Sequence, residues 1–416
     1  MRRGRVVHVV RVVVLGEFRG DRLVPPLRDG GADVTVLGFV DAGSFLGPGV
    51  TCGELPAAMD EQVLLHLLRE YRADVALPNM GCPGQEQFLP AYARAATRMR
   101  AAGAGCRMPV HSERFALLAS DKVAFHRLAG ERGWPVPRGV VCAEGKALAG
   151  AVDGLGFPVL VKEARSEFGS GRHYVEDGAG LGRAGAEVRY PVLVQEAVVG
   201  EEYAVELLSG SSSTVAWPVA SLGRLGSDCD PGRRVRVAPV ALPARARGEL
   251  AATVADMTET CGPWGPWQID FAVTDDGRLK VIEVNGRLSG VSNMSWVSTG
   301  CDPHQVYAQA ALGRTPRSPG AGRVALELPV PNGAPLPSEP YGTELQCFPG
   351  SPLNPAPRVR GFHRPVLKVP ERLGDAAHAW LRALPPGTLL NSAADEAAFQ
   401  LDRGLQALRQ GGRAPS

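Results

Sequence analysis

The chain has 416 residues, of which 44% are hydrophobic and 21% charged, and its formal net charge is +2. A chain of this length and composition can bury a large core, and it predicts a soluble globular protein of two or three domains. The nearly balanced charge gives no support for a nucleic-acid or acidic-membrane partner, and no apolar stretch is long enough to predict a transmembrane helix.

Residues 1 to about 115 alternate short apolar strands with helices. Basic residues before the first apolar run are a feature of signal peptides, but His8 and Arg11 interrupt the run, so it predicts a buried strand instead. Strands are predicted at 11–16, 33–37 and 74–78, and helices at 21–28 and 61–71. This alternation predicts a parallel sheet.

Two loops of this unit follow strands. The first, GEFRG, lacks the GxGxxG spacing and gives no support for dinucleotide binding. The loop 78–86 follows the third strand, and open sheets place ligands at the carboxyl ends of their strands. It is a candidate for substrate contact, and a purely structural turn is an equal alternative.

Two lysines lie at positions that invite a functional reading: one at the start of a predicted helix and one just before a glycine-rich loop. Ser120 is predicted to cap a helix that begins at Asp121, with Lys122 in its first turn, where a positive charge is unfavourable for the helix dipole. A strand at 158–162 ends in Lys162 and precedes the loop SEFGSGRH and a strand at 173–176. The amides of Gly169, Ser170 and Gly171 could fold over phosphates as a lid, although GSG alone is more often a plain hairpin loop.

A strand at 191–195 leads through a short crossover into another strand. The crossover from Glu196 to Val198 can offer a carbonyl and an amide to an adenine edge, and Glu202 can accept hydrogen bonds from ribose hydroxyls. Glu202, Ala204 and Glu206 share one strand face. The alternative is an edge strand with solvated acids.

A basic run and a helix come before the next strands. Arg233, Arg234 and Arg236 predict a solvated strand face, although one of them could reach a phosphate or a substrate carboxylate. A helix at 245–261 then leads to the segment WQIDFAVTDDGRLKVIEVNGRLSG at 267–290. This segment predicts a β-hairpin with Asp276 and Gly277 as a two-residue turn.

The predicted turn places Asp270 opposite Glu283, where two like charges repel unless a cation lies between them. Alternation puts Asn285 on the same face and turns Ile282 and Val284 into a core. Carboxylate and amide oxygens of this kind hold magnesium in ATP chemistry. A surface hairpin with a solvated acidic face is the alternative, and Arg287, two residues after Asn285, favours the site.

The remainder of the chain is less informative. Residues 313–341 are rich in Pro, Gly and Ser and predict a linker or loosely packed strands. A strand is predicted at 365–369, and helices at 375–384 and 393–410, the second capped by Ser392.

Residues 115–300 resemble the ATP-grasp superfamily, especially its carboxylate-amine ligase and carbamoyl-phosphate-synthase-like branch. The motifs that carry the resemblance occur in the family's order: SDKVAFHRLA, FPVLVK, the GSG loop, VLVQEAVVGEEYAVE, RVAPVALP, QIDFAV and VIEVNGRLSG. The resemblance implies a mixed α/β and α+β architecture. A Rossmann-like domain (1–115) would precede a two-subdomain ATP-grasp fold, with a lid-bearing part (116–190) and a metal-binding part (191–315). A C-terminal α+β extension (316–416) would pack on this core.

The resemblance also implies roles for individual residues. Lys122 and Lys162 would contact ATP phosphates under the 169–171 lid, and Lys162 and Arg287 would act on the transferred phosphoryl group. Adenine would lie against Gln195, Glu196 and Val198, and ribose against Glu202. The magnesium ligands would be Asp270, Glu283 and Asn285. In some relatives Gln or Glu stands in place of Asp270.

The function implied is an ATP-dependent ligase that joins a small carboxylate to an amine. Its cofactors would be ATP and two magnesium ions, for which manganese can substitute, and a homodimer is the family's common habit. The eight cysteines show no CxxC spacing, which favours a reduced, cytoplasmic setting. Two alternatives keep the fold: a bicarbonate-activating enzyme of the carboxylase type, and a nucleotide-binding protein without chemistry.

Overall fold

The computed structural model describes residues 9–38, 46, 49–56, 59–80, 85–166, 170–210, 213–226, 231–348 and 361–411. Within these ranges, the N-terminal part is a parallel sheet of four strands in the order β3-β2-β1-β4. Its strands are β1 (Arg11–Leu15), β2 (Asp33–Gly38), β3 (Thr51–Glu54) and β4 (Val75–Pro78), and its helices are α1 (Gly20–Asp29), α3 (Glu61–Glu70) and α4 (Leu89–Ala101). The predicted parallel sheet is confirmed. The part of the first apolar run before residue 9 lies outside the described residues.

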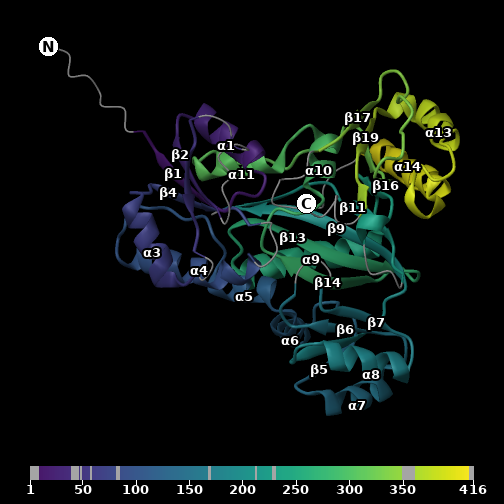
Figure 1. Ribbon diagram of the computed structural model, residues 1–416, viewed down its shortest axis with the longest axis horizontal. Helices are drawn as coiled ribbons and strands as arrows, with labels where there is room; N and C mark the ends of the chain where they lie inside the picture. Colours follow the sequence, from purple (N-terminus) through teal and green to yellow (C-terminus); the bar gives the residue numbers. More distant parts are fainter. Residues whose placement is uncertain are drawn as a thin grey trace.

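The two faces of this sheet are both covered, as a parallel sheet requires. Val13 and Leu15 of β1 pack in the same core as the leucines of α3, and Val12 and Val14 pack with those of α1 and with α11 (Pro303–Ala311). Figure 1 shows α3 and α4 on one side of the sheet and α1 and α11 on the other. The edge strand β3 was not predicted, because its sequence TCGE is largely exposed and has no apolar pattern.

The second unit is an antiparallel sheet in the order β5-β8-β6-β7. It contains β5 (Gly139–Cys142), β6 (Val159–Glu163), β7 (Arg172–Val175) and β8 (Val192–Glu196), covered by α7 (Leu148–Leu155) and α8 (Gly178–Glu187). These elements share a small core of their own and form the lower lobe in Figure 1. Because β8 pairs with β5 and β6, the predicted boundary at residue 190 falls one strand too early.

A large antiparallel sheet makes up the rest of the described chain, in the order β14-β13-β9-β11-β12-β15-β19-β17. Its strands are β9 (Gly200–Ser209), β11 (Ala220–Arg224), β12 (Arg236–Ala238), β13 (Gly265–Thr274), β14 (Leu279–Asn285), β15 (Val324–Glu327), β17 (Glu344–Gln346) and β19 (Val366–Val369). In addition β10 (Thr214–Ala216) pairs with β9, and β16 (Val330–Pro331) pairs with β18 (Phe362–His363). The C-terminal region therefore extends this sheet with strands of its own.

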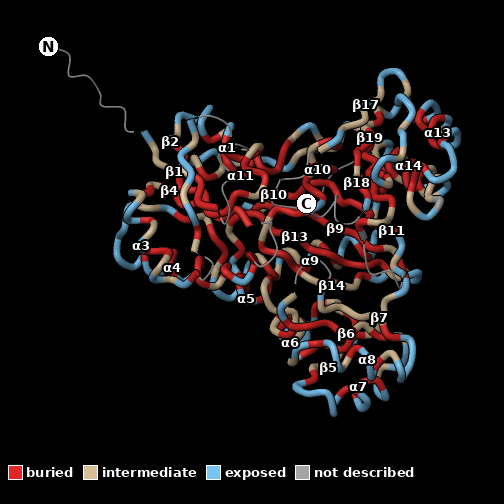
Figure 2. Tube along the Cα trace, viewed as in Figure 1, coloured by how far each residue is buried: buried red, intermediate tan, exposed pale blue. Residues whose placement is uncertain are grey.

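Helices cover both faces of the large sheet. One face is apolar and packs in a single core with residues of α5 (Glu113–Ser120), α9 (Ala244–Cys261), α13 (Gly374–Arg382) and α14 (Ala394–Arg409). On the other face, α10 (Ser292–Thr299) packs over β12, β15 and β19. Figure 2 shows the buried residues concentrated along this sheet. Short 3-10 turns are η1 (Glu86–Phe88), η2 (Gly145–Ala147), η3 (Pro231–Arg233), η4 (Glu371–Leu373) and η5 (Leu390–Ser392).

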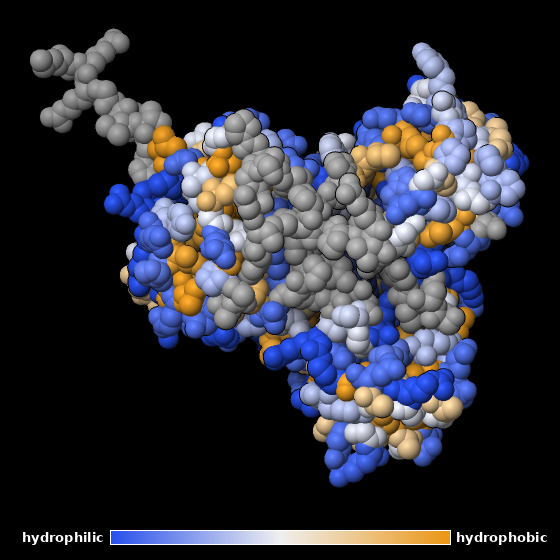
Figure 3. All heavy atoms as spheres, viewed as in Figure 1, coloured by the Kyte–Doolittle hydropathy of each residue, from blue (hydrophilic) through white to orange (hydrophobic). Residues whose placement is uncertain are grey.

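On the face shown in Figure 3, small groups of hydrophobic side chains are interrupted by hydrophilic ones. None of the helices in the described part of the chain has both the length and the apolarity needed to cross a membrane.

Two predicted helix caps are wrong. Helix α6 (Lys122–Arg132) is capped by Asp121, whose Oδ1 accepts from the Val123 and Ala124 N–H groups at 3.0 Å each. Ser120 still belongs to α5, and its hydroxyl donates to Ala116 O. Helix α14 begins at Ala394, and its N-cap position is Ala393 rather than the predicted Ser392.

The hairpin of β13 and β14 has the predicted pairing of Asp270 with Glu283, but its loop and its register differ from the prediction. Its loop has three residues rather than two, because the Thr274 N–H donates to Arg278 O and Gly277 takes a φ of +78°. One extra residue, Ile282, then bulges from β14 and restores the pairing of Asp270 with Glu283. Ile282 is consequently only half-buried and lies outside the core that its neighbour Val284 joins, contrary to the prediction.

The apolar face of this hairpin is expected to carry much of the stability. Trp267 is fully buried and packs edge-on against Phe115, with 5.3 Å between the ring centroids. Its indole N–H donates to Ser209 Oγ at 2.9 Å. Trp267→Ala should lower the free energy of unfolding by about 3–5 kcal/mol, measured by urea denaturation. The control Tyr341→Ala, at a fully exposed aromatic residue, should change it by less than about 0.5 kcal/mol. An equal effect of the two substitutions would contradict this account of the core.

Candidate functional site

Polar side chains share one face of three neighbouring strands, β9, β13 and β14. The strand register places them in three rows: Glu206, Gln268 and Asn285; Ala204, Asp270 and Glu283; Glu202, Ala272 and Lys280. The residues between them, such as Val205, Ile269 and Val284, point into the core on the other face. The predicted common face of Glu202, Ala204 and Glu206 is thereby confirmed.

Asp270 and Glu283 lie opposite each other in the middle row. The Asn285 Nδ2 donates to Asp270 Oδ2 at 2.9 Å, and the Gln268 amide donates to Oδ1. Burial, together with the negative charge of Glu283, raises the pKa of Asp270 well above its ordinary value. Burial acts in the same direction on Glu283, but the positive charge of Lys122 and its neighbours outweighs it and lowers the pKa.

This donor set fits a magnesium ion. Two opposed carboxylates repel each other, and a divalent cation removes the conflict. Asn285 uses its amide nitrogen on Asp270, which leaves its oxygen as a ligand atom of the kind magnesium prefers. Among the described residues, no three His, Cys, Asp or Glu side chains are grouped as metal ligands. The set therefore depends on two carboxylates and one amide, and phosphate oxygens would have to complete the coordination.

Positive charges surround the two acids. Lys162 is 3% exposed, and its Nζ donates to Gln195 Oε1 at 2.8 Å. Burial lowers the pKa of Lys162 to about 8, because the charged ammonium has lost most of its hydration. The Lys122 Nζ lies 3.8 Å from Glu283 Oε2 and donates to Ser166 O. Both predicted phosphate lysines therefore lie beside the acidic pair.

Arg172 is a third cation that sequence reasoning missed. It lies directly opposite Lys162 in the β6–β7 pair, and its charge contributes to lowering the pKa of Glu283. The available signal was its position immediately after the GSG sequence, where antiparallel pairing returns the chain to Lys162.

Arg287 is held by a residue of the N-terminal unit. Its Nε lies 2.9 Å from Glu86 Oε1, and both side chains are largely buried. The predicted contact loop 78–86 thus reaches the site through Glu86, although residues 81–84 lie outside the described part. This ion pair fixes the guanidinium beside Asp270 and Glu283. Its positive charge opposes the upward shift of the Asp270 pKa and adds to the downward shift of the Glu283 pKa.

The predicted adenine residues behave differently from one another. The Glu196 carboxylate accepts from the Arg138 N–H at 2.9 Å and from Arg138 Nε at 2.8 Å, so its side chain has a structural role. The Val198 N–H makes no backbone hydrogen bond with a described residue and remains a candidate for the adenine edge. Gln195 binds Lys162 and lies 3.4 Å from His126 Nδ1. Its side chain therefore positions the lysine.

Glu202 forms an ion pair with Arg234 at 2.7 Å, and both side chains are almost buried. Arg236 likewise pairs with Glu327 in the interior. The prediction of a solvated basic strand is therefore wrong for Arg234 and Arg236. Arg236 belongs to β12, an interior strand of the large sheet, and Arg234 lies two residues before that strand. The ribose role of Glu202 stays a prediction.

The lid is described only in part. Gly169 lies outside the described residues, and Ser170 is exposed. Gly171 has a φ of +58°, and a Cβ there would come within 2.7 Å of Glu163 Cδ. Glycine at 171 is therefore required by the turn itself, and contact of 169–171 with phosphates stays a prediction.

Comparison with known proteins agrees with this geometry. Residues 227–318 match the family model "Carbamoyl-phosphate synthase L chain, ATP binding domain". The carbamoyl phosphate synthase large chain of Bifidobacterium animalis is 26% identical over 314 residues. That match covers 72% of this chain and 27% of the relative, so the chain spans about a quarter of that protein.

Solved structures share the fold across nearly the whole chain. The L-amino acid ligase of Bacillus licheniformis has a TM-score of 0.64 at 19% identity, covering 94% of this chain and 97% of its own. The biotin carboxylase of Campylobacter jejuni has a TM-score of 0.67 at 14% identity, covering 97% and 98%. These likenesses show that the chain shares its fold with those enzymes, and the sequence matches agree with the resemblance of residues 115–300 to the ATP-grasp superfamily.

Proposed function

We propose that this protein is an ATP-dependent carboxylate-amine ligase that forms an amide or peptide bond and releases ADP and phosphate. The observation that carries the proposal is the opposed pair Asp270 and Glu283, surrounded by Lys122, Lys162 and Arg287. Two acids that share a cation, beside three basic groups, match the charge of a metal-bound triphosphate. Support also comes from the fold shared with an L-amino acid ligase.

The residues have separate tasks in the proposed reaction. Magnesium held by Asp270, Glu283 and Asn285 would neutralise the phosphates and orient the γ-phosphoryl group. Lys122 and Lys162 bind phosphate oxygens, and Arg287 offers a fork of donors to the oxygens as charge moves during transfer. Two magnesium ions, replaceable by manganese, belong to the same proposal, as do a homodimer and a cytoplasmic location.

Bond changes balance in two steps. A carboxylate oxygen attacks the γ-phosphorus, the bond to ADP breaks, and an acyl phosphate forms. The amine nitrogen then attacks the acyl carbon, phosphate leaves, and the nitrogen loses a proton. The lid excludes water, which would otherwise hydrolyse the acyl phosphate. Adenine would lie against the Val198 N–H, and ribose against Glu202.

A second candidate uses bicarbonate as the acid. It is favoured by the similarity to biotin carboxylase, whose TM-score of 0.67 slightly exceeds the 0.64 of the amino-acid ligase. A protein that binds nucleotide without chemistry is the third alternative. The grouping of two acids with three basic side chains favours catalysis over binding alone.

A screen of ADP release over pairs of amino acids separates these candidates. The ligase should release ADP only when both an acid and an amine are present, and hydroxylamine should trap the activated acid as a hydroxamate. Bicarbonate-dependent turnover without an amino acid would favour the carboxylase type. Release of AMP and pyrophosphate would contradict the mechanism, and magnesium-dependent ATP binding without any turnover would favour the third alternative.

A further inference from the structure

Glu206 is a buried acid that the reaction described above does not use. It lies on the polar face of β9, one row from Asp270, and is 1% exposed. Its Oε1 accepts from the Ser292 hydroxyl and, at 3.4 Å, from the Ser289 N–H. Its Oε2 is buried and has no hydrogen bond of normal geometry with a described residue, although the Ser295 hydroxyl also favours the charged form of this carboxylate. A carboxylate in this state needs a cationic or hydrogen-bond donor partner.

Gln268 adds a second acceptor directly across the strand pair. It faces Glu206 in the β9–β13 register, a position at which Cβ atoms lie about 4.5–5.5 Å apart. Because the Gln268 nitrogen donates to Asp270, the amide orientation is set, and Oε1 is the atom without a partner. Two directly paired residues therefore each carry a buried acceptor atom without a hydrogen-bond partner of normal geometry among the described residues.

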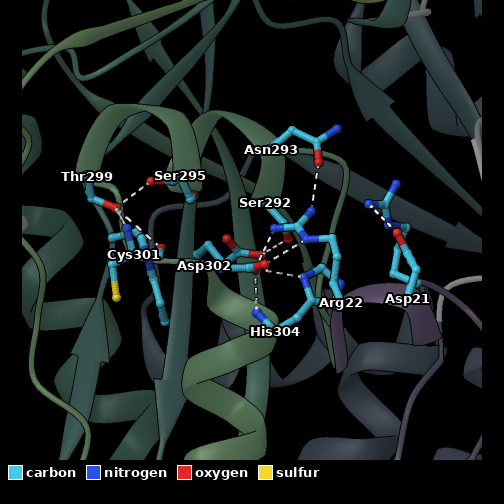
Figure 4. A network of polar contacts seen from close by, with 12 residues as sticks. Asp21, Arg22, Ser292, Asn293, Ser295, Thr299, Cys301, Asp302 and His304 are labelled. Atoms are coloured by element: carbon cyan, nitrogen blue, oxygen red, sulfur yellow. Dashed lines mark hydrogen bonds and ion pairs between the residues drawn. The ribbon is translucent and has the colours of Figure 1, made fainter. Parts of the chain in front are cut away.

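The nearest positive charge is already neutralised. The Arg22 Nε donates to Asp302 Oδ2 at 2.8 Å, and Nη1 donates to Asn293 Oδ1 at 2.8 Å, as Figure 4 shows. The guanidinium also lies 4.6 Å from the centre of the Trp296 ring. Arg22 thus belongs to a closed cluster beside Ser292, and its charge is balanced by Asp302.

His304, which lies beside Asp302, does not supply a positive charge either. Burial lowers the pKa of His304 to about 4, so this histidine is neutral at pH 7. Burial raises the pKa of Glu206 to about 7, despite hydrogen bonds that favour its charged form. The carboxylate is therefore poorly stabilised without a ligand, and a cation at Oε2 would restore its charge.

We propose that Glu206 and Gln268 bind the ammonium group of a substrate. An ammonium has three N–H donors, and two of them can be accepted by these two oxygens, one of which is charged. Their row is about 7 Å along the strands from Asp270 and Glu283, the distance of two residues. An amino acid with its ammonium here can reach the phosphates at the middle row. This inference rests on the proposed ligase function and adds a substrate class: at least one substrate carries a cationic amine.

The ammonium can come from the acid substrate or from the amine substrate, which must lose a proton before its nitrogen attacks, and kinetics distinguish them. In the first assay, hydroxylamine is the nucleophile, and an α-amino acid is compared with the same acid lacking its amino group. In the second, the acid is saturating and the amine concentration varies. The variant E206Q keeps the side-chain shape and removes the charge. Its matched control is E344Q, at a residue of β17 whose side chain is 51% exposed.

E206Q should raise KM about 10- to 100-fold for the substrate that carries the ammonium, as expected for loss of a charge-assisted hydrogen bond. The KM for MgATP should stay unchanged, and E344Q should match wild type. A rise for the amino acid in the first assay assigns the ammonium to the acid. A rise for the amine in the second, with an unchanged hydroxylamine rate, assigns it to the nucleophile.

The unfolding temperature of E206Q distinguishes a binding role of Glu206 from a structural role, because the two roles predict changes of opposite sign. Without ligands, E206Q should unfold at the same temperature as wild type or higher, because an unpaired buried charge is removed. A large loss of stability would overturn the proposal, as would unchanged KM values or a shift in magnesium dependence instead. If E206Q does not fold, the wild type still decides: equal KM values for the cationic substrate and its neutral analogue overturn the inference.

Failure of this inference differs from failure of the proposed function. If wild type turns over substrate pairs and E206Q has the same KM values, only the ammonium site is excluded. If wild type releases no ADP with any acid and amine, the ligase function itself is excluded, and the ammonium site with it.

Discussion

Glu283→Gln should lower magnesium-dependent ADP release by about 100- to 1,000-fold, the scale of losing several kcal/mol of transition-state charge stabilisation. Glu283 lies opposite Asp270 and 3.8 Å from the Lys122 ammonium, so in the proposed site its charge would hold both the magnesium ion and this lysine. The amide of glutamine keeps the shape of the side chain but removes the charge that attracts both.

The same variant should lose stabilisation by MgADP in thermal unfolding, because a ligand stabilises only in proportion to its affinity. Asp275→Asn is the matched control, since Asp275 lies in the loop of the same hairpin and its side chain is 69% exposed. It should retain wild-type turnover. If Glu283→Gln folds with a wild-type spectrum and keeps its magnesium-dependent activity, this acidic pair is not the metal site.

Lys162→Met should also reduce turnover by about 100-fold or more, because a buried cation aimed at phosphate oxygens is worth most where water is excluded. In wild type the apparent affinity for MgATP should weaken as the pH rises through about 8, the pKa to which burial lowers Lys162. Only the protonated amine attracts phosphate. A pH profile of KM for MgATP measures this, and Lys146→Met, at a side chain that is 79% exposed, is the control.

The effect of this lysine on stability has the opposite sign. The unfolded chain holds the Lys162 proton up to about pH 10.5, whereas the folded chain holds it only to about pH 8. Between these values the unfolded state binds more protons, so raising the pH across this window favours the folded state. Lys162→Met removes the buried charge and should raise the unfolding temperature at pH 7. A lower temperature would mean that Lys162 has a structural role.

Local rules were sufficient where neighbours in sequence decide the outcome. The alternation in β9 and β13 predicted which side chains share the polar face, because successive residues of a strand point to opposite sides. Lys162 was identifiable as the last residue of an apolar strand, and Gly133, in a left-handed conformation, ends α6. The pairing of Asp270 with Glu283 was also correct, although the loop and the bulge that produce it were not predicted.

The sequence by itself therefore determined many of the strands, including the acidic hairpin, and half of the helices in the described part of the chain, since these depend on periodicity and short-range sterics. Only the tertiary structure decided that Glu86 holds Arg287, that Arg172 faces Lys162 and that the Gln195 side chain accepts from Lys162. It alone left Glu206 buried with one oxygen unpaired. These contacts join residues from separate elements, and the partner of a buried charge depends on which distant strands and helices pack around it.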